Sequence, residues 1–194
     1  MVQPSQDVRG RIVAGAADMI RRRGLNATSV RTLAKHADAP LGSTYHYFPE
    51  GKQQLATEAV RFAGDLLSRT LRRELAAGPA AGLRAFFALW RETVLDTDFR
   101  AGCPVLAVAI EEPPEGETPA VLTAAAEVFS AWEALLADSL REHGADAHQA
   151  EQIATLVVAA VEGTVAMCRA KRSIEPLDRT AEQLQALVSS VIDD

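Results

Sequence analysis

Apolar residues recur at the three- and four-residue spacing of an α-helix along almost the whole chain. No segment shows the apolar and polar alternation of a half-buried strand. Alanine and leucine, which both favour helix, dominate a composition that is 48% hydrophobic, enough for a packed core. A chain of 194 residues makes one large domain or two smaller ones the natural expectation. The pattern therefore predicts an all-α protein of about nine helices.

The start of the chain predicts a first amphipathic helix and a short second one. Val8 to Ile20 form one apolar stripe, and Gly24 supplies a C-terminal stop. Thr28 or Ser29 then caps a short helix that ends near Ala37.

A third, equally short helix is predicted from Leu41 to about Tyr47. It follows a tight turn at Asp38, and Pro40 suits its first position. Pro49 and Gly51 end it. Two short helices joined by a tight turn behind a first helix form a helix-turn-helix, whose second helix reads the major groove of DNA. The sequence thus predicts a DNA-binding domain at 1–52 and an effector-binding and dimerisation domain at 53–194.

The third predicted helix offers small and hydrogen-bonding groups where a core helix would carry large apolar ones, while Phe48 is expected to anchor it. Hydroxyl and backbone N–H groups at the start of the second helix suit a phosphate, as does Lys52. The predicted DNA contacts are Thr28, Ser29, Arg31, Leu41, Gly42, Ser43, Thr44, Tyr45, His46, Tyr47 and Lys52.

The distribution of charge agrees with this assignment. The chain has a net charge of −6, but residues 1–61 hold nine basic and five acidic groups, a net +4. The remainder holds 11 basic and 21 acidic groups, a net −10. Only the N-terminal part is therefore expected to meet the phosphates of DNA.

Beyond residue 52 the periodicity predicts six further helices, separated by glycine and proline. Their approximate ranges are 52–77, 80–96, 104–110, 120–143, 147–172 and 178–192. The stretch 111–119, with three prolines and a glycine, is predicted to be an exposed loop.

Aromatic residues at helical spacing are mostly core residues, yet an effector pocket between helices needs such a lining with a few polar groups. The predicted pocket residues are Phe86, Phe87, Trp90, Arg91, Cys103, Leu106, Ile110, Phe129, Trp132, Glu133, Val157 and Glu162.

The last two predicted helices carry small and branched apolar residues that allow close packing. Packing within one bundle explains that pattern equally well. A palindromic DNA site, however, requires a two-fold symmetric protein, so we expect a four-helix interface between two copies. The predicted interface residues are Ile153, Leu156, Val157, Ala160, Gly163, Thr164, Leu184, Leu187 and Val191.

Other classes of site find little support. Cys103 and Cys168 form neither a disulfide framework nor a metal-binding spacing, which fits a reducing cytoplasm. No signal peptide, no apolar run long enough to cross a bilayer, and no Glu-x-x-His pair, nucleophile–base arrangement or phosphate loop is evident. We expect no catalytic residues, no metal, no cofactor and no membrane contact. An enzyme on a helical bundle is a remote alternative.

Three segments carry a resemblance to a known family: Thr28-Ser-Val-Arg-Thr-Leu-Ala-Lys-His-Ala, Gly42-Ser-Thr-Tyr-His-Tyr-Phe and Gly51-Lys-Gln-Gln-Leu. They resemble the DNA-binding head of TetR-family bacterial regulators over about residues 8–60. Ala101 to Glu111 and Val161 to Arg172 are similar to the LmrA/YxaF-like branch.

The resemblance implies an all-helical cytoplasmic homodimer that represses transcription from a double-stranded DNA operator until a small-molecule effector enters its C-terminal domain. The branch suggests flavonoid or drug-like effectors by analogy, and the sequence does not identify this one. An activator or a ligand-independent regulator is the alternative.

Two residues depart from the branch pattern. Leu41 stands where the branch often has a basic residue, and Asp38 replaces a glycine in the turn. Aspartate tolerates left-handed geometry better than most residues, but it adds a negative charge near DNA. We therefore expect this head to depend on dimerisation for useful affinity.

Overall fold

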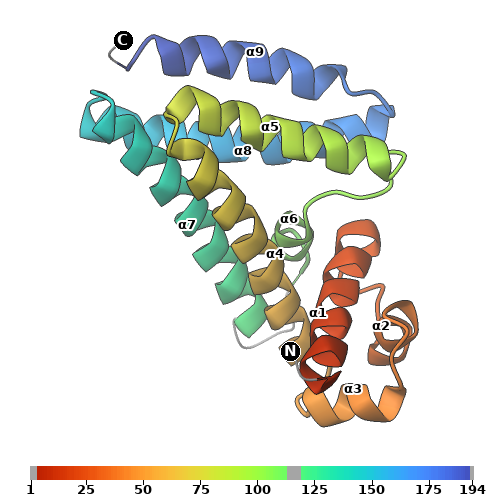
Figure 1. The fold of residues 1–194 in the computed structure, drawn as a ribbon. Helices are drawn as coiled ribbons and strands as arrows, with labels where there is room; N and C mark the ends of the chain where they lie inside the picture. Colours follow the sequence, from red (N-terminus) through yellow and green to blue (C-terminus); the bar gives the residue numbers. More distant parts are fainter. Residues whose placement is uncertain (1–3, 113–118, 193–194) are drawn as a thin grey trace. The chain divides into compact units, whose positions relative to one another are not determined.

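The computed structural model describes residues 4–112 and 119–192, and this part of the chain is all-α, with nine helices and no strand (Figure 1). The predicted fold class is confirmed. The helices are α1 (Pro4–Arg23), α2 (Val30–His36), α3 (Leu41–Tyr47), α4 (Lys52–Leu75), α5 (Pro79–Asp96), α6 (Pro104–Ala109), α7 (Ala120–Glu142), α8 (Ala147–Lys171) and α9 (Glu175–Ser189).

The chain divides into two compact units. Unit 1 consists of Met1–Asp65 and Cys103–Val128, and unit 2 consists of Leu66–Gly102 and Phe129–Asp194. Helices α4 and α7 contribute residues to both. The functional boundary at residue 52 is a separate matter and stays a prediction.

Unit 1 is built around α1, which packs against α2, α3 and α6. The buried stripe of α1 includes Ile12, Ala16 and Ile20, each with 0% exposure, and Leu33 of α2 and Phe48 at the C-cap of α3 are equally buried. This stripe is the one that the periodicity predicted, and Phe48 is the anchor that was expected. The N-terminal three helices thus share one core, which holds α3 against α1.

Unit 2 contains α5, α8 and α9, which pack on one another, together with parts of α4 and α7 (Figure 1). Gly78, with φ +99, precedes Pro79 at the first position of α5. Helix α9 begins at Glu175, three residues before its predicted start, because Pro176 lies in the first turn, where its missing N–H costs no hydrogen bond.

Two helices, α7 and α8, are long and apolar enough to cross a membrane by length and composition, with mean hydropathies of 1.4 and 1.6. This corrects the expectation that no apolar run reaches that length. The same test is passed by core helices of soluble proteins, and 39% and 50% of the two most apolar windows are buried within the structure. Length and hydropathy are therefore weak evidence for a membrane here.

Candidate nucleic-acid interface

Helix α2 is held at its start by a reciprocal pair of hydrogen bonds. The Ser29 hydroxyl accepts from the Thr32 N–H at 3.2 Å, and the Thr32 hydroxyl accepts from the Ser29 N–H at 2.8 Å. This capping box satisfies two N–H groups that the helix leaves without an internal partner. It settles the choice between Thr28 and Ser29 as the cap in favour of Ser29.

The turn between α2 and α3 explains why Asp38 stands where a glycine is common. Asp38 has φ +49. Its N–H donates to the Lys35 carbonyl at 3.3 Å, and the N–H of Ala39 donates to the Ala34 carbonyl at 3.0 Å. These are the two hydrogen bonds of a Schellman motif with a left-handed residue after the helix end. Aspartate adopts that conformation at low cost, so the predicted tight turn is confirmed.

Helix α3 has one inward and one outward side. Thr44 is 0% exposed, and its hydroxyl donates to the Pro40 carbonyl at 3.2 Å. Pro40 itself is the N-cap, one position before the predicted one. On the other side Tyr45 is 53% exposed. At Gly42 no described atom outside the local helix backbone lies within 4 Å of the point that a Cβ atom would occupy. The outward side thus has an exposed aromatic ring and an open backbone.

The remaining predicted contacts of α3 are partly or fully exposed. His46 is exposed, whereas Leu41, Ser43 and Tyr47 are half-buried. The rings of His46 and Tyr47 meet edge to face with 5.4 Å between centroids. Helix α3 therefore presents Tyr45 and His46 more fully than it presents Tyr47.

Two predicted contacts, Thr28 and Thr44, lie inside the head. Thr28 is 6% exposed, and its hydroxyl donates to the Leu25 carbonyl at 2.7 Å. Both threonine hydroxyls are engaged with backbone carbonyls, which argues against side-chain contacts with DNA from either residue. Small polar residues fit a buried helix position when the backbone supplies a hydrogen-bond acceptor.

Exposed cations surround the two short helices. Arg31 and Lys35 are exposed and Lys52 is half-buried, and none of the three forms an ion pair within the described ranges. Lys35 was not among the predicted contacts. Its spacing of four residues from Arg31, which places both on one face of α2, is the signal that identifies it.

Arg9 of α1 contacts both the residue that ends α3 and a carboxylate of α4. The Arg9 guanidinium lies 5.3 Å from the centroid of the Phe48 ring, and it pairs with the Glu58 carboxylate at 2.5 Å. Arg9 thus links α1 to the end of α3 and to α4.

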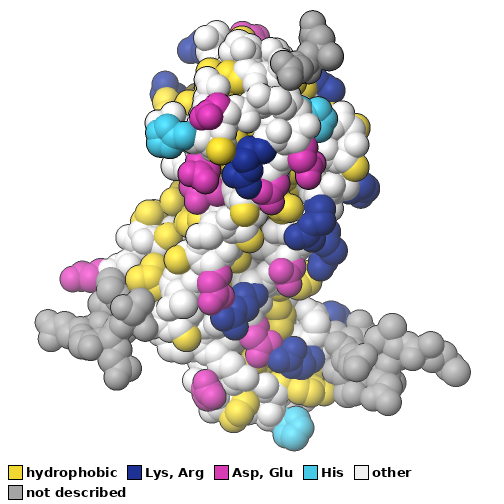
Figure 2. All heavy atoms as spheres, turned by 90° about the vertical axis from the view of Figure 1, so that its left-hand side faces the viewer, with side chains coloured by type: hydrophobic (Ala, Val, Ile, Leu, Met, Phe, Trp, Pro, Cys, Tyr) yellow, Lys and Arg dark blue, Asp and Glu magenta, His cyan; other side chains and the backbone are white. Residues whose placement is uncertain are grey.

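On the face shown in Figure 2, acidic and basic side chains are interspersed, without a large patch of one sign.

The residues predicted to line an effector pocket are mostly buried. Trp132 stacks edge to face with Phe86 and Phe129, with 6.3 and 5.7 Å between ring centroids. Trp90 is 4% exposed, and its indole N–H has no hydrogen-bond partner in the described structure. Phe87, Val157 and Glu162 are buried too, and Glu133 is half-buried.

The other predicted pocket residues are either exposed or part of unit 1. Arg91 is exposed and pairs with Asp178 at 3.3 Å. Cys103, Leu106 and Ile110 belong to unit 1. Cys103 caps α6 and accepts from the Leu106 N–H at 3.5 Å, while Ile110 is 74% exposed.

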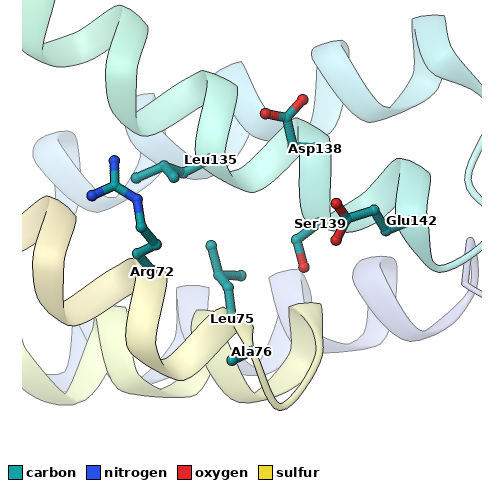
Figure 3. A pocket seen from close by; sticks show the side chains of 7 residues that line it. All are labelled: Arg72, Leu75, Ala76, Leu135, Asp138, Ser139 and Glu142. Atoms are coloured by element: carbon teal, nitrogen blue, oxygen red, sulfur yellow. The ribbon is translucent and has the colours of Figure 1, made fainter.

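A cavity of about 260 Å³ lies between α4 and α7 within unit 2 (Figure 3). None of its lining residues was predicted for the effector pocket. They are Arg72, Leu75, Ala76, Leu135, Asp138, Ser139 and Glu142.

Helix α8 has an exposed apolar face. Leu156 is 47% and Met167 46% exposed, and at the exposed Gly163 between them the space that a Cβ atom would occupy is open to a radius of 4 Å. Met167 was not among the predicted interface residues. Four predicted interface residues, by contrast, are buried within their own chain: Ile153, Val157, Thr164 and Leu184.

Three predicted interface residues remain: Ala160, Leu187 and Val191 are half-buried.

Comparisons with known proteins identify the family of the chain. Residues 12–59 match the family described as bacterial regulatory proteins, tetR family, and residues 79–183 match the C-terminal domain of LmrA/YxaF-like transcriptional regulators. The chain is 38% identical to the HTH-type transcriptional regulator Rv0196 of Mycobacterium tuberculosis over 94% of this chain and 95% of the relative. It is 30% identical to the HTH-type regulator YxaF of Bacillus subtilis, with the same coverages.

Solved structures show the same fold. A regulatory protein TetR from Rhodobacter sphaeroides superposes with a TM-score of 0.79 at 21% identity, over 91% of this chain and 96% of that one.

Proposed function

The chain belongs to the TetR family of DNA-binding transcriptional regulators, in its LmrA/YxaF-like branch, and from that membership we propose that it is a repressor. It binds a palindromic operator in the cytoplasm as a homodimer, and a small molecule releases it. The observation that carries the proposal is the outward side of α3, where the exposed Tyr45 ring follows an open backbone at Gly42. A recognition helix needs such a face to enter a major groove.

The outer contacts of the head extend this interface. His46 reaches base edges or phosphates beside Tyr45, and Arg31, Lys35 and Lys52 neutralise phosphates. The capping box already occupies the N–H groups of Ser29 and Thr32, so a phosphate at the start of α2 binds to the N–H groups between them, those of Val30 and Arg31. The buried Thr28 and Thr44 hydroxyls support the fold of the head instead.

The homodimer is supported by the apolar face of α8. Glycine inside a helix costs about 1 kcal/mol relative to alanine, and Gly163 has open space that a side chain would fit in the isolated protomer. Close approach of a second helix accounts for the glycine, because a small residue lets two backbones meet. Leu156 and Met167 on the same face then lose their exposure.

Release by a small molecule is supported by the aromatic cluster around Trp132. Trp90 has a buried indole N–H without a hydrogen-bond partner among the described residues, and Glu162 places a carboxylate at 4% exposure on the neighbouring α8. A mostly apolar lining with a few polar groups is what small-molecule sites require. The effector shifts the population towards a form whose two α3 helices are wrongly spaced for successive major grooves.

The experiment that tests the proposal is selection of genomic DNA fragments by the purified protein, followed by footprinting of the retained fragments. A protected palindrome with half-sites about one helical turn apart is expected. Transcription from the protected promoter should rise when the gene is deleted. A fall would identify an activator, and retention of no fragment in low salt would refute the DNA-binding assignment for this chain.

A further inference from the structure

Glu111 joins the end of α6 to the loop between α1 and α2. It follows Ile110, the C-cap of α6. Its Oε1 atom accepts a hydrogen bond from the Leu25 N–H at 2.6 Å, and its Oε2 atom accepts one from the Asn26 N–H at 2.8 Å. A carboxylate that accepts two consecutive backbone N–H groups makes charge-assisted hydrogen bonds, which are about twice as strong as neutral ones.

The loop is shaped to receive this carboxylate. Gly24 ends α1 with φ +78, and its N–H donates to the Ile20 carbonyl at 2.8 Å. A side-chain carbon at Gly24 would collide with the Glu111 carboxylate. Glycine is therefore favoured here by the left-handed backbone, and it leaves open the space that the Glu111 carboxylate occupies.

The hydrogen bonds continue from this loop into α2. The carbonyl of Leu25, whose N–H is bound by Glu111, accepts from both the N–H and the hydroxyl of Thr28, at 3.0 and 2.7 Å. Thr28 precedes Ser29, the cap of α2. The carboxylate of Glu111 is thus linked, through the hydrogen bonds of the α1–α2 loop, to Thr28, the first residue of the helix-turn-helix.

Helix α6 is a suitable element for carrying a signal. It packs against α1. Leu106 within α6 and Ile110 at its C-cap are both predicted from the sequence to contact the effector. Leu106 lies within α6, five residues before Glu111, which directly follows the C-cap Ile110. A movement of α6 that follows ligand contact at Leu106 would displace the Glu111 carboxylate from two N–H groups.

We propose that Glu111 is the positioning residue through which α6 sets the α1–α2 loop, and with it the helix-turn-helix, so that ligand-driven movement of α6 reaches the DNA-binding head through this carboxylate. The inference rests on the proposed function for the ligand and the DNA. The hydrogen-bonded link itself does not. Coupling of this kind needs an element with two arrangements that both sites bias, and the making or breaking of two hydrogen bonds supplies them.

The first test compares Glu111→Ala and Glu111→Gln with Glu112→Ala, which removes the same charge from the exposed neighbouring residue. Amide hydrogen exchange, measured by NMR on the full-length protein, should be faster at Leu25 and Asn26 in Glu111→Ala. The glutamine variant keeps one acceptor oxygen and should lie between. Exchange in Glu112→Ala should match the unmodified protein. Unchanged protection in Glu111→Ala would overturn the link without touching the proposed function.

The second test measures coupling without an effector. Leu106→Trp enlarges the predicted ligand-contacting side chain of α6, and its effect on DNA affinity is measured with and without Glu111→Ala, on a fragment retained in the genomic selection. We expect Leu106→Trp to weaken binding at least about fivefold when Glu111 is present, the lower end of usual allosteric couplings. In the Glu111→Ala background the loss should be under about twofold.

The four affinities form a double-mutant cycle, and its outcomes separate the coupling role of Glu111 from the proposed DNA-binding function. Equal losses in both backgrounds, or no loss in either, would overturn the coupling role of Glu111 while leaving DNA binding intact. If the unmodified protein retains no fragment, the proposed function fails, and the hydrogen-exchange result still decides whether Glu111 holds the loop. Circular dichroism of each variant confirms that it is folded. A helical Glu111→Ala protein with protected Leu25 contradicts the proposal directly.

Discussion

The Asp18 carboxylate accepts a hydrogen bond from His36, with 2.8 Å between Oδ2 and Nε2, and so joins α1 to the last turn of α2. The same carboxylate also accepts from Arg21 and Arg22, three and four residues further along α1. Burial raises the pKa of Asp18, but the hydrogen bonds from Arg22, Arg21 and His36 outweigh it, and the pKa lies below the ordinary aspartate value. The ionised form of Asp18 therefore stabilises the head.

The first prediction concerns acid stability. A carboxyl group with a lowered folded-state pKa contributes stability above its unfolded pKa and loses it as the pH falls through the folded one. Asp18→Asn should reduce the free energy of unfolding by about 1 kcal/mol at pH 7, and by less at pH 3. Urea unfolding at both pH values measures this. The exposed Asp65→Asn is the matched control, and an equal effect of Asp18→Asn at both pH values contradicts the prediction.

The second prediction separates stability from DNA binding at Gly42. Alanine fits there without contact, and near a helix start it should leave the free energy of unfolding unchanged or raise it by up to about 1 kcal/mol. If α3 enters the major groove with its backbone close to DNA, the added methyl group should weaken operator affinity by about tenfold, the cost of about 1.4 kcal/mol of steric mismatch. Fluorescence anisotropy measures the affinity. Gly10→Ala, equally open on α1, should not change it.

The third prediction distinguishes base reading from phosphate neutralisation. Tyr45→Ala should weaken operator binding by about 1–3 kcal/mol with little change in salt dependence. Lys52→Ala should weaken binding to every DNA sequence and reduce the slope of log affinity against log salt by about 1. Lys171→Ala, at the end of α8, is the control. Both variants should sediment as the unmodified protein does, and unchanged affinity in both would remove α3 and its flank from the interface.

The contrast between α3 and Glu111 shows what the sequence could predict. The bounds of α3 follow from local signals, Pro40 before it and Gly51 after it, and the structure confirms them. Glu111 was placed in an exposed loop because composition describes only neighbours in sequence. Its hydrogen bond to Leu25 spans 86 residues, and no periodicity records a contact of that separation.

The sequence also could not predict which way single side chains point, because that depends on packing between helices. Thr44 was predicted with the DNA contacts because a small hydroxyl suits either side of a helix, and its burial depends on the packing of α3 against α1. Trp90 and Trp132 show the same limit in unit 2, since aromatic residues at helical spacing are buried whether or not a ligand binds beside them.

The last prediction tests the proposed dimer at Gly163. Leucine there favours the helix by about 0.5–1 kcal/mol and has room in the protomer, so the folded protomer should persist. If a second α8 packs against this glycine, the larger side chain forces the two helices apart, and overpacking typically costs about 1–3 kcal/mol. The dimer dissociation constant, measured by sedimentation equilibrium, should then rise at least about fivefold. Gly10→Leu makes the same change on an open face of α1 and should leave the constant unaltered. DNA affinity should fall in step with dimer loss in Gly163→Leu alone, because a palindrome is bound by two heads together. A Gly163→Leu protein that remains as firmly dimeric as the unmodified one would place the interface on another surface.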